Sequence, residues 1–333
     1  MKKRMLALIL AAGLLAFALS GCAGSGKEYR AYDYSFDTDI TLIAVCESEE
    51  AFDGLRELIF GTMRSLHCAF DIYDEYDGVN NLATVNSLAG QPVAVGEEII
   101  DLLLFSKEMY DRTGGRVNVA MGSVLSQWKT ARDTGILPDP AALEAARDHC
   151  NIDDVVISKS AGTVTLRDPE MSLDVGAVAK GWAAQRAAEA ADAAGYSDFI
   201  LSAGGNVVVR GTGLNGRAWR IGIRDPQSED GSGVAMALDG ADGMCLVTSG
   251  GYERNLTVDG KTYCHIIDPD TLYPADKVLS ATVICDDSGL ADGLSTALFL
   301  MEPQEGLDLA KSMGVRAVII DKTGAVLDTA EAS

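Results

Sequence analysis

Three short stretches carry side chains whose types and spacing could do chemistry. Asp174 and Lys180 bracket a glycine-containing turn with opposite charges. Asp292 precedes Thr296 by one helical turn, a spacing that would place both side chains on one face of a helix. His265 is one of only three histidines and stands close before a proline. Lysine suits an anionic ligand, carboxylate and hydroxyl oxygens suit a hard cation, and histidine suits proton transfer.

The first stretch, 173–182, changes its hydrophobic period in mid-course. Strand-like alternation precedes it at 163–166 and 171–173, and an alanine-rich helical pattern over 179–194 follows it. This pattern predicts a strand-to-helix turn. Gly176 would let the backbone approach a ligand, and the free N–H groups of the helix N-terminus would form an anion site. The alternative is an ordinary connection whose aspartate caps the helix and whose lysine is solvated.

The segment 291–301 predicts a helix that opens with an acidic residue. Asp292, Ser295 and Thr296 would then present oxygen atoms on one face, which suits Mg²⁺ rather than zinc. The alternative is that Asp292 caps the helix while Thr296 packs inside. A lone histidine is usually structural, but His265 lies in a predicted turn, where polar groups are more often functional.

The N-terminus predicts export and lipid attachment. Residues 1–21 combine a basic start with an apolar run that ends in Leu-Ser-Gly before Cys22. The run is too short to predict a spanning helix, and a cysteine after Leu-Ser-Gly is the lipid-attachment position of bacterial lipoproteins. We expect Cys22 to carry lipid, residues 22–30 to form a tether, and the protein to sit on the extracytoplasmic face of the cell membrane. The alternative is a plain signal peptide with an incidental cysteine.

The charge balance excludes one class of partner. The chain has 27 Lys and Arg against 49 Asp and Glu, a net charge of −22, which becomes −25 when the three basic residues of the leader are removed. Such a surface repels nucleic acid and anionic headgroups, so no nucleic-acid partner is expected. The lipid, rather than a basic patch, must hold the protein at a membrane.

The rest of the chain predicts an α+β fold in one large unit over 31–333. Strand patterns joined by tight turns alternate with helical patterns, which favours a mixed or antiparallel sheet, and 47% hydrophobic content allows a large core. The predicted strands are 40–45, 199–210 around a glycine turn, and 218–224 as a continuation of the same sheet. The predicted helices are 49–68, 93–113 and 141–149.

Five motifs follow one another along the chain: LDVGAVAKG (173–181), SAGGN (202–206), TSG (248–250), HIIDP (265–269) and ADGLST (291–296). In this order they resemble the ApbE family of flavin transferases, and a lipoprotein signal is also usual for that family. The resemblance runs from about Phe36 to the C-terminus. It implies a single large ApbE-like domain, related to the T-fold, with a mixed or antiparallel sheet and flanking helices.

The resemblance also implies an activity. Its members are Mg²⁺-dependent enzymes that take FAD, transfer the FMN half to a threonine or serine hydroxyl of an acceptor protein and release AMP. The acceptors are typically exported or membrane-bound redox subunits, such as those of the Rnf and Nqr complexes. Cleaving a pyrophosphate requires neutralised phosphate oxygens, which Mg²⁺ and Lys180 can provide, and a positioned or deprotonated acceptor hydroxyl. His265 is our candidate for the base.

Residue by residue, the resemblance implies two sets of contacts around the turn. Asp174 and Lys180 would contact FAD. The main-chain carbonyl of Ala177, with Asp292 and Thr296, would bind Mg²⁺.

Further along, the main chain at Ile267 and the side chain of Tyr73 would border the flavin nucleotide, and Phe36 matches a position that is often methionine. Leu272 departs from the family pattern, because it stands where a glycine is usual. The segment 115–122 also departs from the commoner form.

Two other functions fit the same residues. One is an FAD pyrophosphatase, in which water replaces the acceptor hydroxyl and free FMN and AMP are released. The other is a non-catalytic lipoprotein that binds and stores FAD.

Overall fold

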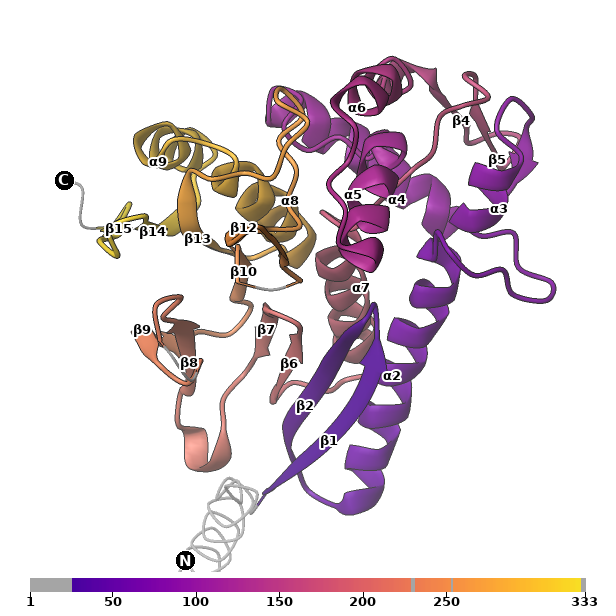
Figure 1. The fold of residues 1–333 in the computed structure, drawn as a ribbon. Helices are drawn as coiled ribbons and strands as arrows, with labels where there is room; N and C mark the ends of the chain where they lie inside the picture. Colours follow the sequence, from indigo (N-terminus) through magenta and orange to yellow (C-terminus); the bar gives the residue numbers. More distant parts are fainter. Residues whose placement is uncertain (1–25, 229–230, 253, 331–333) are drawn as a thin grey trace, which may run out of the picture.

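The computed structural model describes residues 26–228, 231–252 and 254–330 (Figure 1). The predicted signal sequence and Cys22 lie outside these ranges. The predicted tether, 22–30, is wrong in its described part, because strand β1 begins at Lys27. In the described ranges, no helix is long and apolar enough to cross a bilayer.

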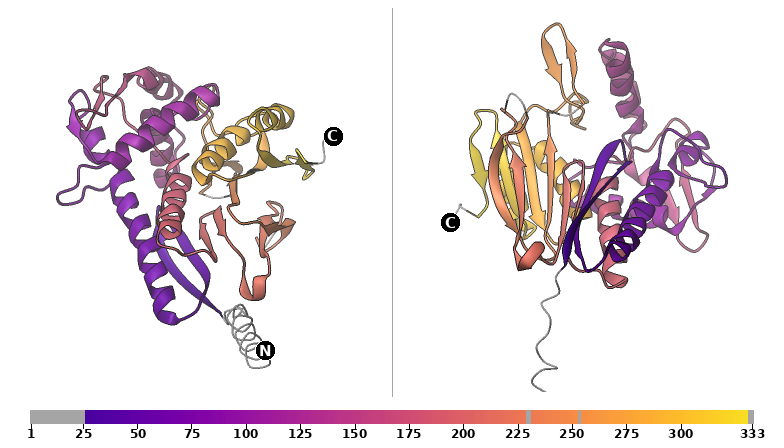
Figure 2. Two further views of the ribbon diagram at one scale, coloured as in Figure 1. Left: turned by 180° about the vertical axis from the view of Figure 1, so that it is seen from behind. Right: turned by 90° about the horizontal axis from the view of Figure 1, so that it is seen from below.

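One antiparallel sheet organises the chain, and every pair of neighbouring strands in it runs in opposite directions. Its strands, in their order across the sheet, are β1 (Lys27–Ser35), β2 (Thr38–Cys46), β6 (Phe199–Ala203), β7 (Asn206–Arg210), β10 (Cys245–Gly250), β13 (Val278–Cys285), β14 (Arg316–Asp321) and β15 (Val326–Asp328). Figure 2 shows these strands side by side. The α+β prediction is confirmed, in its antiparallel form.

The β1–β2 hairpin shows how local sequence sets this sheet. Ser35 pairs with Thr38, so Phe36 and Asp37 alone form the turn, and both have positive φ, 55° and 54°. A two-residue turn with positive φ at both positions matches the twist of the flanking strands. Alternate residues of β2 are buried, as expected for a strand with one face on the core.

Helices cover one face of the sheet, where the main hydrophobic core lies. They are α2 (Glu49–Phe70), α7 (Ala179–Ala193), α8 (Ser288–Phe299) and α9 (Pro303–Ser312). Alanines on α7 are buried, which lets α7 lie close against α2 and α8. A Cβ atom added at Gly181 would collide with the main chain of Ser288 and with the Asp292 side chain, so glycine is required where α7 meets α8.

A separate two-stranded sheet packs on the opposite face. It consists of β8 (Trp219–Arg224) and β9 (Val234–Gly240). Trp219, Ile221 and Ile223 are buried against the outer face of the main sheet. The prediction that 218–224 continues the main sheet is therefore wrong: the strand exists, but it pairs only with β9.

The remaining elements form a lobe beside the C-terminal end of α2 (Figure 1). They are α3 (Leu82–Ser87), β3 (Val93–Ala94), α4 (Glu97–Arg112), α5 (Gly122–Thr134), α6 (Pro140–Arg147), η1 (Ile152–Asp154), β4 (Val155–Ser158) and β5 (Thr163–Leu166). The predicted helix at 93–113 starts too early, because its first residues form β3. Two short elements complete the fold: η2 (Leu214–Gly216), and the hairpin of β11 (Leu256–Val258) and β12 (Lys261–Tyr263).

Candidate active site

The turn before α7 is irregular chain rather than the end of a strand. Residues 171–173 do not form the predicted strand, and the backbone N–H of Asp174 instead donates to the carbonyl of Val119 at 2.8 Å. The Asp174 carboxylate accepts a hydrogen bond from the Gly176 N–H at 2.9 Å. The N-cap of α7 is Val178, with no side-chain cap. Asp174 therefore does not cap this helix, and the Ala179 N–H at its start donates to the carbonyl of Val175 at 2.9 Å.

Asp292 is not a helix cap either. Helix α8 begins at Ser288, earlier than predicted, and its N-cap is Asp287, whose carboxylate accepts from the Leu290 N–H at 2.8 Å. Asp292 lies one turn further in and is 4% exposed. Its Oδ2 accepts a hydrogen bond from the Gly181 N–H at 2.7 Å. The carboxylate thus faces the first turn of α7, more than a hundred residues away in sequence.

Burial governs the electrostatics of both carboxyl groups. Desolvation raises the pKa of Asp292, and Lys180, the Gly181 N–H and the Asn206 side chain offset part of that effect. Desolvation likewise raises the pKa of Asp174, which the Gly176 N–H and the charges of Arg132, Arg254 and Lys180 oppose. A bound cation would favour the ionised form of a carboxyl group in such a place.

Hydroxyl groups extend this site along α8. The Ser249 Oγ lies 2.9 Å from the Ser295 Oγ and 3.4 Å from the Thr296 Oγ1. The Ser295 hydroxyl also donates to the carbonyl of Asp292 at 3.0 Å. The sequence alone does not predict Ser249 as a site residue, although it lies in one of the five motifs. Its contact with Ser295, 46 residues away, forms only when β10 and α8 pack together.

The donor set fits a hard cation. Across the described ranges, no group of three or more His, Cys, Asp and Glu side chains could hold a metal. One buried carboxylate, a threonine hydroxyl and a main-chain carbonyl are oxygen donors, and Mg²⁺ is commonly held by one or two carboxylates together with phosphate and water. The predicted ligands Ala177, Asp292 and Thr296 are thus chemically suited to Mg²⁺ that arrives with a phosphate-bearing ligand.

Tyr73 and Phe36 lie near the C-terminal end of α2. The Phe36 ring packs edge-on against His67, with 5.4 Å between ring centres, and its N–H donates to the His67 Nδ1 at 3.4 Å. Tyr73 follows α2 in a loop held by Asp71, whose carboxylate accepts from the Tyr73 N–H at 2.8 Å. Desolvation and the charge of Asp174 raise the pKa of Tyr73 to about 12, so its phenol stays protonated although the residue is 58% exposed.

His265 and Ile267 lie on the loop between β12 and β13, which folds back on itself. Ile267 forms a bridge with Pro274, and the Leu272 N–H donates to the Asp268 carbonyl at 2.8 Å. Leu272 has φ of 63°, so it keeps the left-handed backbone that glycine usually provides at this position. The Trp128 indole donates to the Leu272 carbonyl at 2.8 Å, which fixes this loop to α5.

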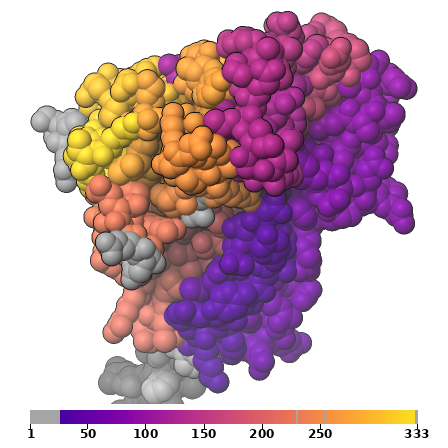
Figure 3. Space-filling model, viewed as in Figure 1, coloured from indigo at the N-terminus to yellow at the C-terminus, as the bar shows by residue number. Residues whose placement is uncertain are grey.

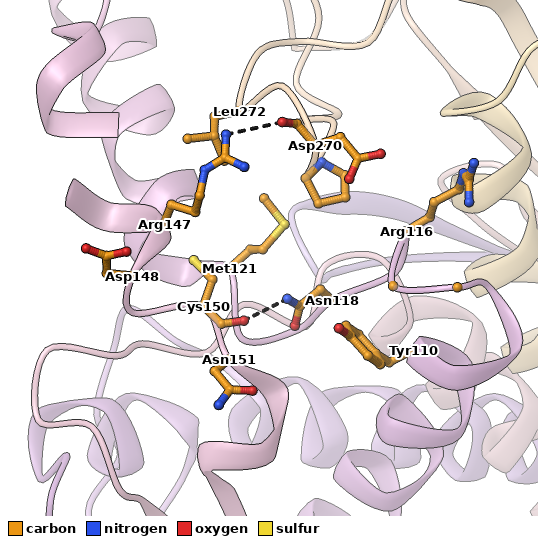
Figure 4. A pocket seen from close by; sticks show the side chains of 13 residues that line it. Tyr110, Arg116, Asn118, Met121, Arg147, Asp148, Cys150, Asn151, Asp270 and Leu272 are labelled. Carbon is orange, nitrogen blue, oxygen red and sulfur yellow. Dashed lines mark hydrogen bonds between the residues drawn. The ribbon is translucent and has the colours of Figure 1, made fainter. Parts of the chain in front are cut away.

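A cavity of about 320 Å³ lies between the chain that follows α4, the end of α6 and the loop between β12 and β13 (Figure 4). None of the predicted site residues lines it. Asn118 and Met121 on one wall flank Val119, whose carbonyl binds the Asp174 N–H, and Asp270 and Leu272 on another wall continue the His265 loop. One wall of the cavity is therefore linked to the turn, and another belongs to the loop that carries His265.

Fold and site together define a class: an α+β protein that can hold an anionic ligand and a hard cation between the first turns of two packed helices. The sequence model of the ApbE family matches residues 36–319. The chain belongs to the ApbE family.

Relatives and solved structures agree with this membership. A protein of Treponema pallidum named FAD:protein FMN transferase is 34% identical over 256 residues, 72% of this chain and 70% of its own length. A Klebsiella pneumoniae protein of the same name is 28% identical over 239 residues, 70% of this chain and 68% of its own length. The ApbE crystal structure from Thermotoga maritima is 28% identical and superposes with a TM-score of 0.82 over 90% of this chain and 96% of that one.

Proposed function

We propose that this chain transfers FMN from FAD to a threonine or serine hydroxyl of an acceptor protein, with Mg²⁺ as cofactor and AMP as the second product. The observation that carries the proposal is the buried Asp292 carboxylate, held against the Gly181 N–H beside Lys180. This arrangement places a buried negative oxygen and a positive side chain together at the first turn of a helix. The carboxylate oxygen suits Mg²⁺, and the lysine suits the phosphate oxygens that accompany it.

Each part of the site has a role in the proposal. Lys180 binds the pyrophosphate oxygens. Ala177, Asp292 and Thr296 hold Mg²⁺, which neutralises charge on the phosphates when it is bound. Tyr73 and Phe36 border the flavin.

The reaction then needs one proton transfer. The acceptor hydroxyl oxygen forms a bond to the phosphorus of the FMN half, and the bond from that phosphorus to the bridging oxygen breaks. AMP leaves with the bonding electron pair. The hydroxyl proton passes to His265, which acts as general base.

An incubation with FAD and Mg²⁺ tests the proposal. The probe is a purified exported flavoprotein subunit of the Rnf or Nqr type, and mass spectrometry and thin-layer chromatography report the products. Covalent flavin on the subunit together with AMP supports transfer. Free FMN and AMP would support the pyrophosphatase instead, and unchanged FAD would support a binding protein. A His265→Gln variant, which keeps a polar side chain but cannot act as a base, should bind FAD and transfer far more slowly.

The location of the enzyme is a separate proposal. Lipid on Cys22 would hold the protein on the extracytoplasmic face of the membrane, as the leader sequence predicts. In a detergent phase separation, the wild-type protein should enter the detergent phase and a Cys22→Ser variant should not gain lipid. Wild-type protein in the aqueous phase would remove the anchor from this account.

A further inference from the structure

We propose that Lys129, Arg132 and Arg254 form a basic rim beside the flavin end of the site, and that this rim binds acidic side chains of the acceptor protein. The inference rests on the proposed transfer function, because only a transferase must dock a second protein here. In Figure 3, α5 and the segments around β11 and β12 meet on one face, directly above the tip of the β1–β2 hairpin. The rim residues come from α5 and from the loop before β11.

Helix α5 contributes two of the three cations. Lys129 and Arg132 are one turn apart on α5, so they share a face. The Lys129 Nζ lies 5.3 Å from the centre of the Tyr73 ring, which places this face of α5 over the loop that carries Tyr73. The Arg132 charge acts on the same place, because it lowers the pKa of Tyr73 against the larger effects of desolvation and of Asp174.

The Arg132 side chain is half-buried but has no internal hydrogen-bonding partner. Within the part of the chain that the structure describes, its guanidinium makes no hydrogen bond or ion pair. An arginine normally uses its fork of donors, and a planar fork matches a carboxylate in two parallel hydrogen bonds. The position beside Tyr73 and Asp174 leaves that fork for a partner that arrives at the site.

Arg254 closes the rim from the other side. It follows β10 with φ of 41°, and its guanidinium donates to the main-chain carbonyl of Asp37 at 3.0 Å. This bond joins the loop to the hairpin turn next to Phe36. Arg254 remains 54% exposed in its side chain, and Lys129 43% exposed.

The local charge balance distinguishes the rim from the rest of the surface. Acidic groups face it as well: Asp133 pairs with Lys129 at 3.0 Å, Asp37 lies 3.9 Å from Arg254, and Asp174 lies below. The three cations of the rim equal these three acids in number, in a chain whose net charge is −22. An acidic partner is therefore repelled less at the rim than over the rest of the surface.

Exposure favours a protein over the nucleotide as the ligand of the rim. The pyrophosphate is expected at Lys180 and the buried Asp292, below the surface. The side chains of Arg254 and Lys129 are exposed, so an acceptor protein that approaches Tyr73 from solvent can contact them. Such exposed charges affect association and specificity more than they affect a buried ligand.

Binding of a charged peptide tests the rim without an identified acceptor. The probes are fluorescein-labelled octaglutamate and octalysine, measured by fluorescence anisotropy on the FAD-loaded protein at low ionic strength. The variants are Arg132→Gln with Arg254→Gln, and Arg217→Gln as a matched control. Arg217 is an exposed arginine between η2 and β8, and it belongs neither to the rim nor to the candidate site.

We expect octaglutamate to bind the wild-type protein and the control equally, and the double variant at least about tenfold more weakly. Binding should weaken as salt is added, and the affinity for FAD should stay within about twofold in all three proteins. A large loss of FAD affinity in the double variant would assign the arginines to the nucleotide and overturn the proposal. Octaglutamate that fails to bind, or that binds the double variant as well as the wild type, would overturn it too. Failure of the transferase proposal is distinguishable, because it would appear in the product assay and not in this binding measurement.

Discussion

Replacing Asp292 by asparagine separates a metal ligand from a structural carboxyl group. Asparagine keeps the shape of the side chain and an oxygen that can accept from the Gly181 N–H, but it has no charge. Alanine removes both. The free energy of unfolding should therefore separate the two variants, whereas flavin transfer should fail in both.

The structure sets the magnitudes. In Asp292→Ala the buried Gly181 N–H loses its acceptor, which costs about 1–3 kcal/mol. A domain of this size loses about 2 °C in melting temperature for each kcal/mol. In Asp292→Asn the hydrogen bond is kept and the desolvation cost of a buried charge disappears, so stability should stay within about 1 kcal/mol. Substitutions that merely support a metal ligand cost about 10- to 100-fold, so loss of the ligand's charge should cost at least about 100-fold in transfer.

The assay measures transfer, melting temperature and calorimetric Mg²⁺ binding in the presence of FAD. Asp287→Asn is the matched control, because Asp287 is the real N-cap of the same helix and asparagine caps equally well. That control should keep both activity and stability. An Asp292→Asn enzyme that transfers flavin normally at ordinary Mg²⁺ would remove Asp292 from the metal site.

Three further predictions follow from single contacts. Lys180→Ala should weaken FAD binding by roughly 10- to 150-fold, because a charge-assisted bond to phosphate is worth about 1.5–3 kcal/mol; unchanged affinity in calorimetry would return Lys180 to a solvated role. Leu272→Gly should relieve about 1 kcal/mol of backbone strain but lose a side chain that is 1% exposed, worth about 2–5 kcal/mol, so urea unfolding should show a net loss and a gain would contradict the packing argument. The hydrogen bond from His149 to Asp168, at 2.7 Å, raises the pKa of His149, so its stabilisation of about 0.5–1 kcal/mol is fully present below the unfolded value of about 6.5 and is lost as pH rises through the folded pKa. His149→Gln should therefore lower stability more at pH 5.5 than at pH 9, and an equal loss at both would refute the charge effect.

Local patterns predicted the elements whose sequence and packing agree. The start of α7 was predicted at its observed residue, because alanines with helical spacing follow a glycine turn directly. Helix α8 begins earlier than predicted, because the cap at Asp287 starts it at Ser288 and Gly289 although both are poor helix formers. The strand at 219–224 was found, but its pairing partner was not, since pairing depends on which face of the main sheet is left open.

The candidate site was predictable only where a motif carries the chemistry. The resemblance carried by the five motifs assigns Asp174, Lys180 and Asp292 to one site, and the structure brings the Asp292 carboxylate to the Gly181 N–H, next to Lys180 in the chain. Arg132 was not foreseen, because it belongs to no motif and its relation to Tyr73 depends on how α5 lies over the loop after α2. A side chain of that kind is visible only after the tertiary packing is known.

The length of β1 limits the distance between a membrane and the flavin end of the site. The strand begins at Lys27 and ends at the hairpin turn beside Phe36, and its nine residues span about 30 Å. If lipid is attached at Cys22, the few residues between Cys22 and Lys27 add at most about 18 Å of chain.

The flavin end of the site then lies at most about 50 Å from the lipid surface, and tilting of the domain about its tether brings it closer. A target hydroxyl within that distance would be met by lateral diffusion alone, whereas one held further out would not be reached. The combined length of β1 and the tether would thus select substrates by their distance from the membrane, independently of their sequence.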